Sequence, residues 1–203
     1  MKVLFLNTKS KINIKPLIKK VKIKGKIGLV SIIQYVDLLK DLQKQLPNSI
    51  IIGQVVGCNL VNLSKEKVDS YLYLGVGKFH PIYVARKTKK PTYILNPETQ
   101  EFSLIKKQEI EQYEKQKLGK IKRFLAADKI GIIVSTKPGQ ENLSLALDIK
   151  KKLKKECFIF ATNTLDLNEL ENFPQIQSWI NTSCSRLEAP EILNYEEIPK
   201  EYL

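Results

Sequence analysis

The chain has 203 residues, 34 Lys+Arg against 21 Asp+Glu, and a formal net charge of +13. Hydrophobic residues make up 43%, enough for a packed core, which excludes a wholly disordered chain. No apolar run is long enough to cross a membrane, and the apolar start at residues 1–7 is too short for a signal-peptide core. We therefore predict a cytoplasmic protein with no membrane partner, made of one large or two small α/β domains.

The positive charge favours acidic partners, including RNA and ribosome-associated proteins. Nearly all of the basic residues are lysines scattered along the chain, and the arginines are Arg86, Arg123 and Arg186. No basic stripe is interleaved with aromatic residues, as a nucleic-acid-binding module would need. A basic RNA- or ribosome-binding protein is therefore kept as an alternative only.

In the first half, apolar patterning predicts a helix at 15–21, an amphipathic helix from residue 32 to 46, and strands at 2–6, 26–31, 49–52 and 70–74. Two further short strands are predicted at 92–95 and 101–104, joined by a turn. The polar, lysine-rich residues 87–91 are typical of a linker. We accordingly predict two domains, residues 1–88 and 89–203.

The second half predicts a long helix at 106–127, then a strand at 129–134, a helix at 141–153 and a strand at 157–161. A short helix at 166–172, with Thr164 as its expected cap, precedes a last strand at 177–181. Strands that alternate with helices indicate parallel sheets with right-handed crossovers. The predicted fold is α/β, with two similar small domains, each a parallel sheet flanked by helices.

Polar or reactive residues follow several of these strands: Cys58, the turn 75–80, the loop 135–140 and Cys184. Ligands of such sheets bind beyond the carboxyl ends of the strands. The two glycines of the turn are typical of a phosphate-binding loop, but the full dinucleotide fingerprint is absent. His80 is the single histidine, which fits either a general base or a hydrogen-bonded structural residue.

The cysteines are Cys58, Cys157 and Cys184. Cys157 opens an apolar strand and is expected to be buried packing. The other two have no close partner of the Cys-x-x-Cys kind that zinc sites use, and a single histidine gives a catalytic thiol little support. An iron–sulfur cluster shared between domains stays open, because such clusters need thiolates that converge in space.

Residues 53–58 read GQVVGC, 75–81 read GVGKFHP, 135–140 read STKPGQ and 181–187 read NTSCSRL. In the same order they resemble the motifs G-[EQ]-V-L-G-C, G-D-G-R-F-H-P, S-T-K-x-G-Q and N-T-A-C-P-R-L. These are motifs of the diphthamide-synthesis radical enzymes of archaea and eukaryotes. Each motif alone is weak, but together they span essentially the whole chain.

The resemblance implies a [4Fe–4S] cluster held by three cysteines, one from each of three similar α/β domains, with Cys58 and Cys184 as two of them. It implies a 3-amino-3-carboxypropyl transferase that cleaves S-adenosylmethionine to a radical. That radical attacks an imidazole carbon of one histidine in translation elongation factor 2, the first step of diphthamide biosynthesis. Members of the family act as dimers.

The likeness begins at the family's second domain, so we expect a separate polypeptide to supply the first domain and the third cysteine, in a dimeric or heteromeric assembly. Val76, Lys78 and Ser185 depart from the family motifs. A non-catalytic subunit that docks elongation factor 2 or a reductase is the main alternative to the enzyme.

Arg186 is expected to bind the carboxylate of S-adenosylmethionine, or to form a structural salt bridge. With His80 it makes up the predicted catalytic pair. The loop after the strand at 129–134 suits an anionic carboxylate, or is an ordinary helix cap. The residues predicted to bind the cofactor are Gln54, Gly75, Gly77, Ser135, Thr136, Lys137, Gly139 and Gln140.

Overall fold

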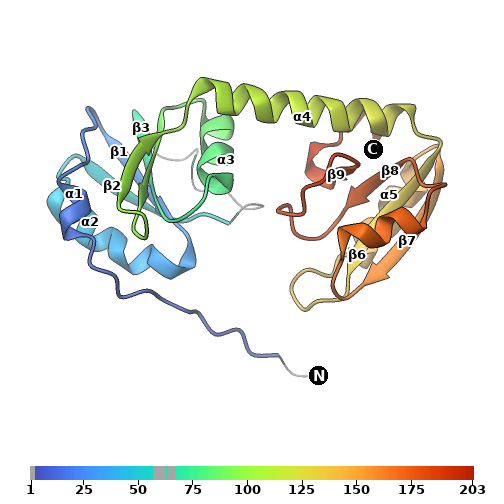
Figure 1. The fold of residues 1–203 in the computed structure, drawn as a ribbon, viewed down its shortest axis with the longest axis horizontal. Coiled ribbons are helices and arrows are strands. Elements are labelled where there is room, and N and C mark those ends of the chain that lie inside the picture. The colour runs from blue at the N-terminus through green and yellow to red at the C-terminus, as the bar shows by residue number, and fades with distance from the viewer. Residues whose placement is uncertain (1–2, 57–62, 64–66) are drawn as a thin grey trace. The chain divides into compact units, whose positions relative to one another are not determined.

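The computed structural model describes residues 3–56, 63 and 67–203 and divides into two compact units, Met1–Glu111 and Gln112–Leu203. Each unit is built on its own sheet (Figure 1), with strand order β2-β1-β3-β4-β5 in the first and β7-β6-β8-β9 in the second. In each unit the first strand lies between the second, which forms one edge of the sheet, and the third, and the remaining strands follow the third. The predicted fold of two similar α/β domains is therefore confirmed.

The first sheet is parallel except at one edge. Its strands are β1 (Ile27–Ser31), β2 (Ser49–Gln54), β3 (Ser70–Leu74), β4 (Thr92–Asn96) and β5 (Glu101–Leu104). β5 runs antiparallel to β4. Their connection is a tight turn in which the Asn96 side-chain oxygen accepts a 2.9 Å hydrogen bond from the Glu98 N–H, as its Asn-Pro sequence predicts.

Helices cover both faces of this sheet. One face carries α1 (Lys15–Ile18), the 3-10 helix η1 (Ile33–Leu38) and α2 (Leu39–Gln45), packed on side chains that include Leu72 and Leu74. The opposite face carries α3 (Phe79–Thr88), packed on Tyr71 and Tyr73. Successive residues of a strand point to opposite faces, so β3 is buried on both sides. The single helix predicted for 32–46 is thus a 3-10 turn followed by an α-helix.

The second unit has the elements α4 (Lys107–Ala126), β6 (Lys129–Ser135), α5 (Leu143–Lys152), β7 (Glu156–Thr162), η2 (Leu167–Asn172), β8 (Ser178–Asn181), β9 (Ile192–Asn194), η3 (Tyr195–Glu197) and η4 (Lys200–Tyr202). α4 begins in the first unit and continues through the second. All the strand pairs of this sheet are parallel. Asp166 caps η2 by accepting from the Asn168 N–H at 3.0 Å, so the predicted cap at Thr164 was wrong.

Two apolar clusters flank the second sheet. On one face, Phe124 of α4 and Ile149 of α5 pack against β6 side chains such as Ile132. On the other face, Trp179 of β8 packs with Leu170 of η2 and with residues of the connections between strands. Because β6 and β8 pair in parallel, their carboxyl ends lie side by side at one edge of the sheet, where the sequence placed its candidate residues.

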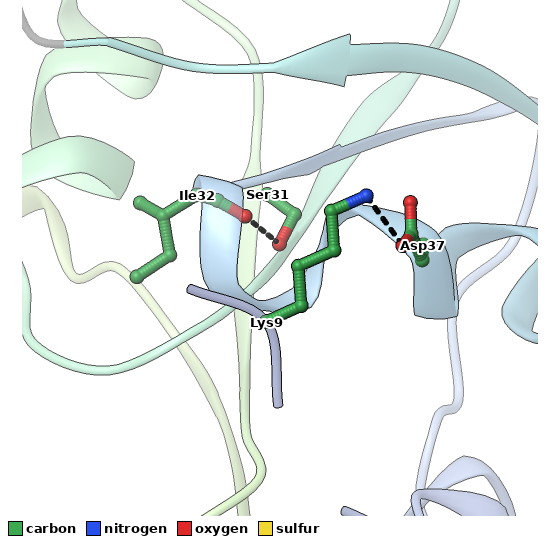
Figure 2. A network of polar contacts seen from close by, with 4 residues as sticks. All are labelled: Lys9, Ser31, Ile32 and Asp37. Carbon is green, nitrogen blue, oxygen red and sulfur yellow. Dashed lines mark hydrogen bonds and ion pairs between the residues drawn. The ribbon is translucent and has the colours of Figure 1, made fainter. Parts of the chain in front are cut away.

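The predicted buried strand at residues 2–6 was wrong. Residues 3–6 form no strand, and Leu4 is 81% exposed. An apolar run becomes a strand only when a neighbouring strand pairs with it. Residues 9 and 10 contact η1 of the first unit. The Lys9 ammonium lies 2.6 Å from the Asp37 carboxylate (Figure 2), and the Ser10 N–H donates to the Gln34 carbonyl.

The boundary expected after residue 88 falls inside the first unit, between α3 and β4. β4 pairs with β3 in parallel, so residues 92–104 belong to the first sheet, and the compact units meet at Glu111 and Gln112. The lysine-rich stretch 87–91 is a helix-to-strand turn, with Lys89 in a left-handed conformation. Composition alone does not distinguish such a turn from a linker. Among the described residues, no helix has both the length and the apolar character needed to cross a bilayer.

Candidate functional site

In the first unit, the predicted residues that the structure describes lie at or shortly after the carboxyl ends of β2 and β3. Gln54 is the last residue of β2 and is exposed. Ser31, at the end of β1, donates to the Leu74 carbonyl at the end of β3 over 2.7 Å, which ties the two strand ends together. Figure 2 shows its second contact, 3.1 Å to the Ile32 carbonyl. The predicted ligand Cys58 lies outside the described residues.

The turn after β3 is shaped by close packing. A Cβ atom at Gly75 would lie 2.6 Å from the Tyr73 hydroxyl oxygen, so only glycine fits there. Gly77 has φ 73°, in the left-handed region. His80 lies in the first turn of α3, half-buried, with its ring centroid 5.1 Å from that of Phe79 and 6.2 Å from that of Tyr73. These contacts explain the turn as structure; its role with a cofactor stays a prediction.

In the second unit, Cys184 sits in a turn directly after β8. The thiol is free and exposed. The Leu187 N–H donates to the Cys184 carbonyl over 3.0 Å, which closes the turn. At its start, the hydroxyl of Thr182 donates to the Ile133 carbonyl of β6 over 2.8 Å. The backbone on both sides of the cysteine is thus held by hydrogen bonds while the residue itself is exposed.

Two buried asparagines hydrogen-bond through their side chains to the backbone of this turn. Asn181, the last residue of β8, donates to the Cys184 carbonyl over 2.8 Å, and its side-chain oxygen accepts from the Ser183 N–H at 2.9 Å. Its amide also donates to the side-chain oxygen of Asn194 at 2.7 Å. Asn194 lies opposite Asn181 on β9 and donates to the Ser185 carbonyl over 3.1 Å.

The loop 135–140 lies beside the Cys184 turn. The Ser135 N–H donates to the Ser183 hydroxyl over 2.9 Å, and the Asn142 amide, at the start of α5, donates to the Thr182 carbonyl over 2.8 Å. Ser135 is buried, and its hydroxyl accepts from the Lys137 N–H at 3.1 Å. The structure therefore brings together two of the four motif segments.

The remaining predicted residues of this unit are exposed around the turn: Thr136, Lys137, Gly139, Gln140 and Arg186. Sequence reasoning missed Asn142 and Asn194, which hold the turn. Asn142 follows the STKPGQ segment closely enough to have been noticed. Asn194 gave no signal, because its three-residue strand β9 was not predicted.

Cys157 differs from Cys184 in its burial. It lies on β7 with 6% of its surface exposed, and burial raises the pKa of its thiol. A buried thiol of raised pKa is a poor metal ligand, because ligation requires the thiolate. The prediction that Cys157 is a packing residue is confirmed.

The donor chemistry of this edge fits one corner of an iron–sulfur cluster, since Cys184 offers an exposed thiol of the soft kind that iron prefers. Among the described residues, no group of three or more His, Cys, Asp and Glu side chains is placed to hold a metal ion. A complete cluster therefore needs thiolates from beyond the described part of the chain.

A separate cavity of about 400 Å³ lies in the second unit, between α4 and the segment after the Cys184 turn. Its lining is of mixed charge: Tyr113, Gln116, Lys117, Gly119, Lys120, Arg123, Glu188, Ala189, Pro190 and Glu197. The Tyr113 hydroxyl donates to the Glu197 carboxylate over 3.2 Å. The predicted site residues are not part of this lining.

Residues 1–198 match the model of a protein family described as "Putative diphthamide synthesis protein". The chain belongs to this family. The match includes all four motif segments, so the resemblance read from the sequence is confirmed.

Two archaeal relatives carry the name 2-(3-amino-3-carboxypropyl)histidine synthase. The protein from Pyrococcus horikoshii is 34% identical over 138 residues, covering 66% of this chain and 39% of the relative. The protein from Methanocaldococcus jannaschii is 28% identical over 189 residues, covering 91% of this chain and 52% of the relative. A relative in Caenorhabditis elegans, 27% identical over 146 residues and matched over 66% of this chain and 35% of its own length, is named subunit 1 of that synthase. The chain thus spans about half or less of these diphthamide-family proteins.

The fold matches a solved structure of the same family. The crystal structure of Dph2 from Pyrococcus horikoshii has a TM-score of 0.81 and 26% identity, over 93% of this chain and 62% of the other. A second structure of that protein, described as containing a 4Fe-4S cluster, has a TM-score of 0.79 and 24% identity over the same shares. Both similarities support the two-unit α/β fold.

Proposed function

We propose that this chain is part of an enzyme for the first step of diphthamide biosynthesis. In that step a 3-amino-3-carboxypropyl group passes from S-adenosylmethionine to a histidine of translation elongation factor 2. The observation that carries the proposal is the exposed thiol of Cys184, held in a braced turn at the carboxyl end of β8. This turn falls within a family motif, and the named relatives of the chain are synthases of this class.

Cys184 and Cys58 are the proposed ligands of a [4Fe–4S] cluster. A third thiolate would come from outside residues 3–203, and we propose a separate chain as its source. The name subunit 1 among the eukaryotic relatives favours a multi-subunit assembly. When bound, the cluster supplies the electron that cleaves the Cγ–S bond of S-adenosylmethionine.

The residues around Cys184 would bind and orient the cosubstrate. The guanidinium of Arg186 can form paired hydrogen bonds with a carboxylate. The exposed loop from Thr136 to Gln140 lies next to the same turn and adds Lys137 and backbone N–H groups. In total, one carbon–sulfur bond breaks and one carbon–carbon bond forms at the imidazole ring. The displaced hydrogen leaves as a proton, and the electron used to cleave the carbon–sulfur bond is returned when the ring regains its aromaticity, so the transfer as a whole is redox-neutral.

The test uses the assembly purified anaerobically through a tag on this chain. With S-adenosylmethionine, a reductant and elongation factor 2, mass spectrometry should detect the added 3-amino-3-carboxypropyl mass on one histidine. Cys184→Ala and Cys58→Ala should each abolish the visible absorbance of the cluster, whereas Cys157→Ala should leave it intact. An assembly without iron that still binds elongation factor 2 would instead establish the non-catalytic subunit.

A further inference from the structure

Asn194 stands on β9, the strand that follows the Cys184 turn, and belongs to none of the family motifs read from the sequence. We propose that Asn194 is a positioning residue which, together with Asn181, fixes the turn so that the Cys184 thiol is presented to the cluster. The inference rests on the proposed function for its metal, but the bracing of the turn can be measured without any metal.

The contacts form a continuous chain from one strand to the other. The Asn181 amide donates to the Cys184 carbonyl over 2.8 Å and to the Asn194 side-chain oxygen over 2.7 Å. The Asn194 amide then donates to the Ser185 carbonyl over 3.1 Å. Two consecutive carbonyls, that of the cysteine and that of the next residue, are therefore both held by side-chain amides. This fixes the peptide plane that follows Cys184.

Burial raises the free-energy cost of breaking these hydrogen bonds. Asn181 and Asn194 are 3% and 4% exposed, whereas Cys184 is exposed. A buried amide that loses its partner keeps the full cost of its desolvation, so both amides hold their partners strongly. The supporting side chains are buried and hydrogen-bonded while the cysteine is exposed, which is the arrangement that a metal ligand and its outer-shell residues need.

The chemistry calls for an amide at position 194. The Asn194 side chain accepts from Asn181 through its oxygen and donates to Ser185 through its nitrogen. A carboxylate can accept but cannot donate. Asn194→Asp therefore removes only the contact to the turn, while Asn194→Ala removes both contacts.

The first measurement is amide hydrogen exchange on the full, metal-free chain. Asn194→Ala and Asn194→Asp should each speed exchange in residues 183–187 about tenfold, because a buried hydrogen bond that braces the turn is lost. Strand β6 should keep its protection. Ile149→Val, a buried substitution in α5, is the control for general destabilisation. It should leave the ratio of the exchange rates of the turn and of β6 unchanged.

The second measurement is iron retention against a chelator in the anaerobically purified assembly. Loss of an outer-shell residue typically weakens metal binding by about 10–100-fold, and both Asn194 variants should show a loss of this size. Unchanged exchange at 183–187, or an equal rise in β6, would overturn the proposal. Faster exchange of the turn with unchanged iron retention would also overturn it. If the wild-type assembly holds no iron while the turn still loosens, the proposed function fails and the bracing role stands.

Discussion

The ring of Trp179 on β8 lies directly over Gly131 on the neighbouring strand β6, so close that a Cβ atom at position 131 would overlap its six-membered ring. The same ring makes edge-to-face contacts with Phe160 at 4.8 Å and Phe173 at 6.1 Å between centroids. Aromatic contacts of this kind add to the area that the rings bury. The glycine thus creates the space in which the aromatic cluster of the second unit packs.

Gly131→Ala should therefore destabilise the second unit by about 1–3 kcal/mol, the usual cost of overpacking a core. Urea unfolding followed by tryptophan fluorescence measures this directly, since Trp179 is the single tryptophan. Gly119→Ala is the matched control: Gly119 is exposed at the border of the cavity beside α4, and an added Cβ there meets nothing within 4 Å. It should stabilise by about 0.5–1 kcal/mol because alanine favours a helix interior. Equal effects of the two substitutions would contradict the packing account.

The two described cysteines should differ sharply in reactivity. Cys184 is exposed, whereas Cys157 is buried and burial raises the pKa of its thiol. In the metal-free native chain, iodoacetamide should modify Cys184 much faster, because only an accessible thiolate reacts. Peptide mass spectrometry gives the rate at each position. In urea the two rates should become similar, and a fast reaction of Cys157 in the native chain would refute its assignment to the core.

The ion pair between Lys78 and Glu109 should give the first unit a pH-dependent contribution to stability. The 2.6 Å hydrogen bond from Lys78, together with the Lys106 N–H, holds the pKa of the Glu109 carboxyl below its ordinary value. A lowered pKa in the folded state means that the contribution is present above the unfolded pKa of about 4.3 and is lost as pH falls through the folded value.

Glu109→Gln should accordingly lower the free energy of unfolding near neutral pH, by no more than about 1 kcal/mol because Lys78 is largely exposed. Urea unfolding at neutral and at strongly acidic pH measures the difference, which should vanish in acid. Glu111→Gln is the control, since its 3.4 Å pair with Lys107 joins two exposed side chains. A deficit of Glu109→Gln that persists unchanged in acid would show that the ion pair is not its cause.

Residues 3–6 should contribute little to folding stability despite their apolar character. Leu4 is 81% exposed, while Leu17 in α1 is 2% exposed. Leu4→Ala should change the free energy of unfolding by less than about 0.5 kcal/mol, as exposed positions do. Leu17→Ala should cost about 2–5 kcal/mol because it leaves a cavity. Chemical denaturation of both variants checks this, and a large loss for Leu4→Ala would restore the predicted strand.

Local patterning predicted the strands and helices well where apolar periodicity was long. The β6 run Ile130–Val134 and the amphipathic positions of α4 and α5 needed no tertiary information. The same reasoning failed for residues 3–6 and for β9, because a strand exists only when a neighbour pairs with it. It also missed α3, whose HPIY start resembles a turn.

The sequence by itself determined the α/β class, the family and the cysteine after β8, since these depend on residue order and on motifs read along the chain. Only the tertiary structure decided which residues support that cysteine. Asn181 and Asn194 meet because β8 and β9 pair in parallel, and Ser135 reaches Ser183 because β6 and β8 are neighbours in the sheet. Contacts between strands arise from sheet order and register, and neither is written in the local pattern of any one segment.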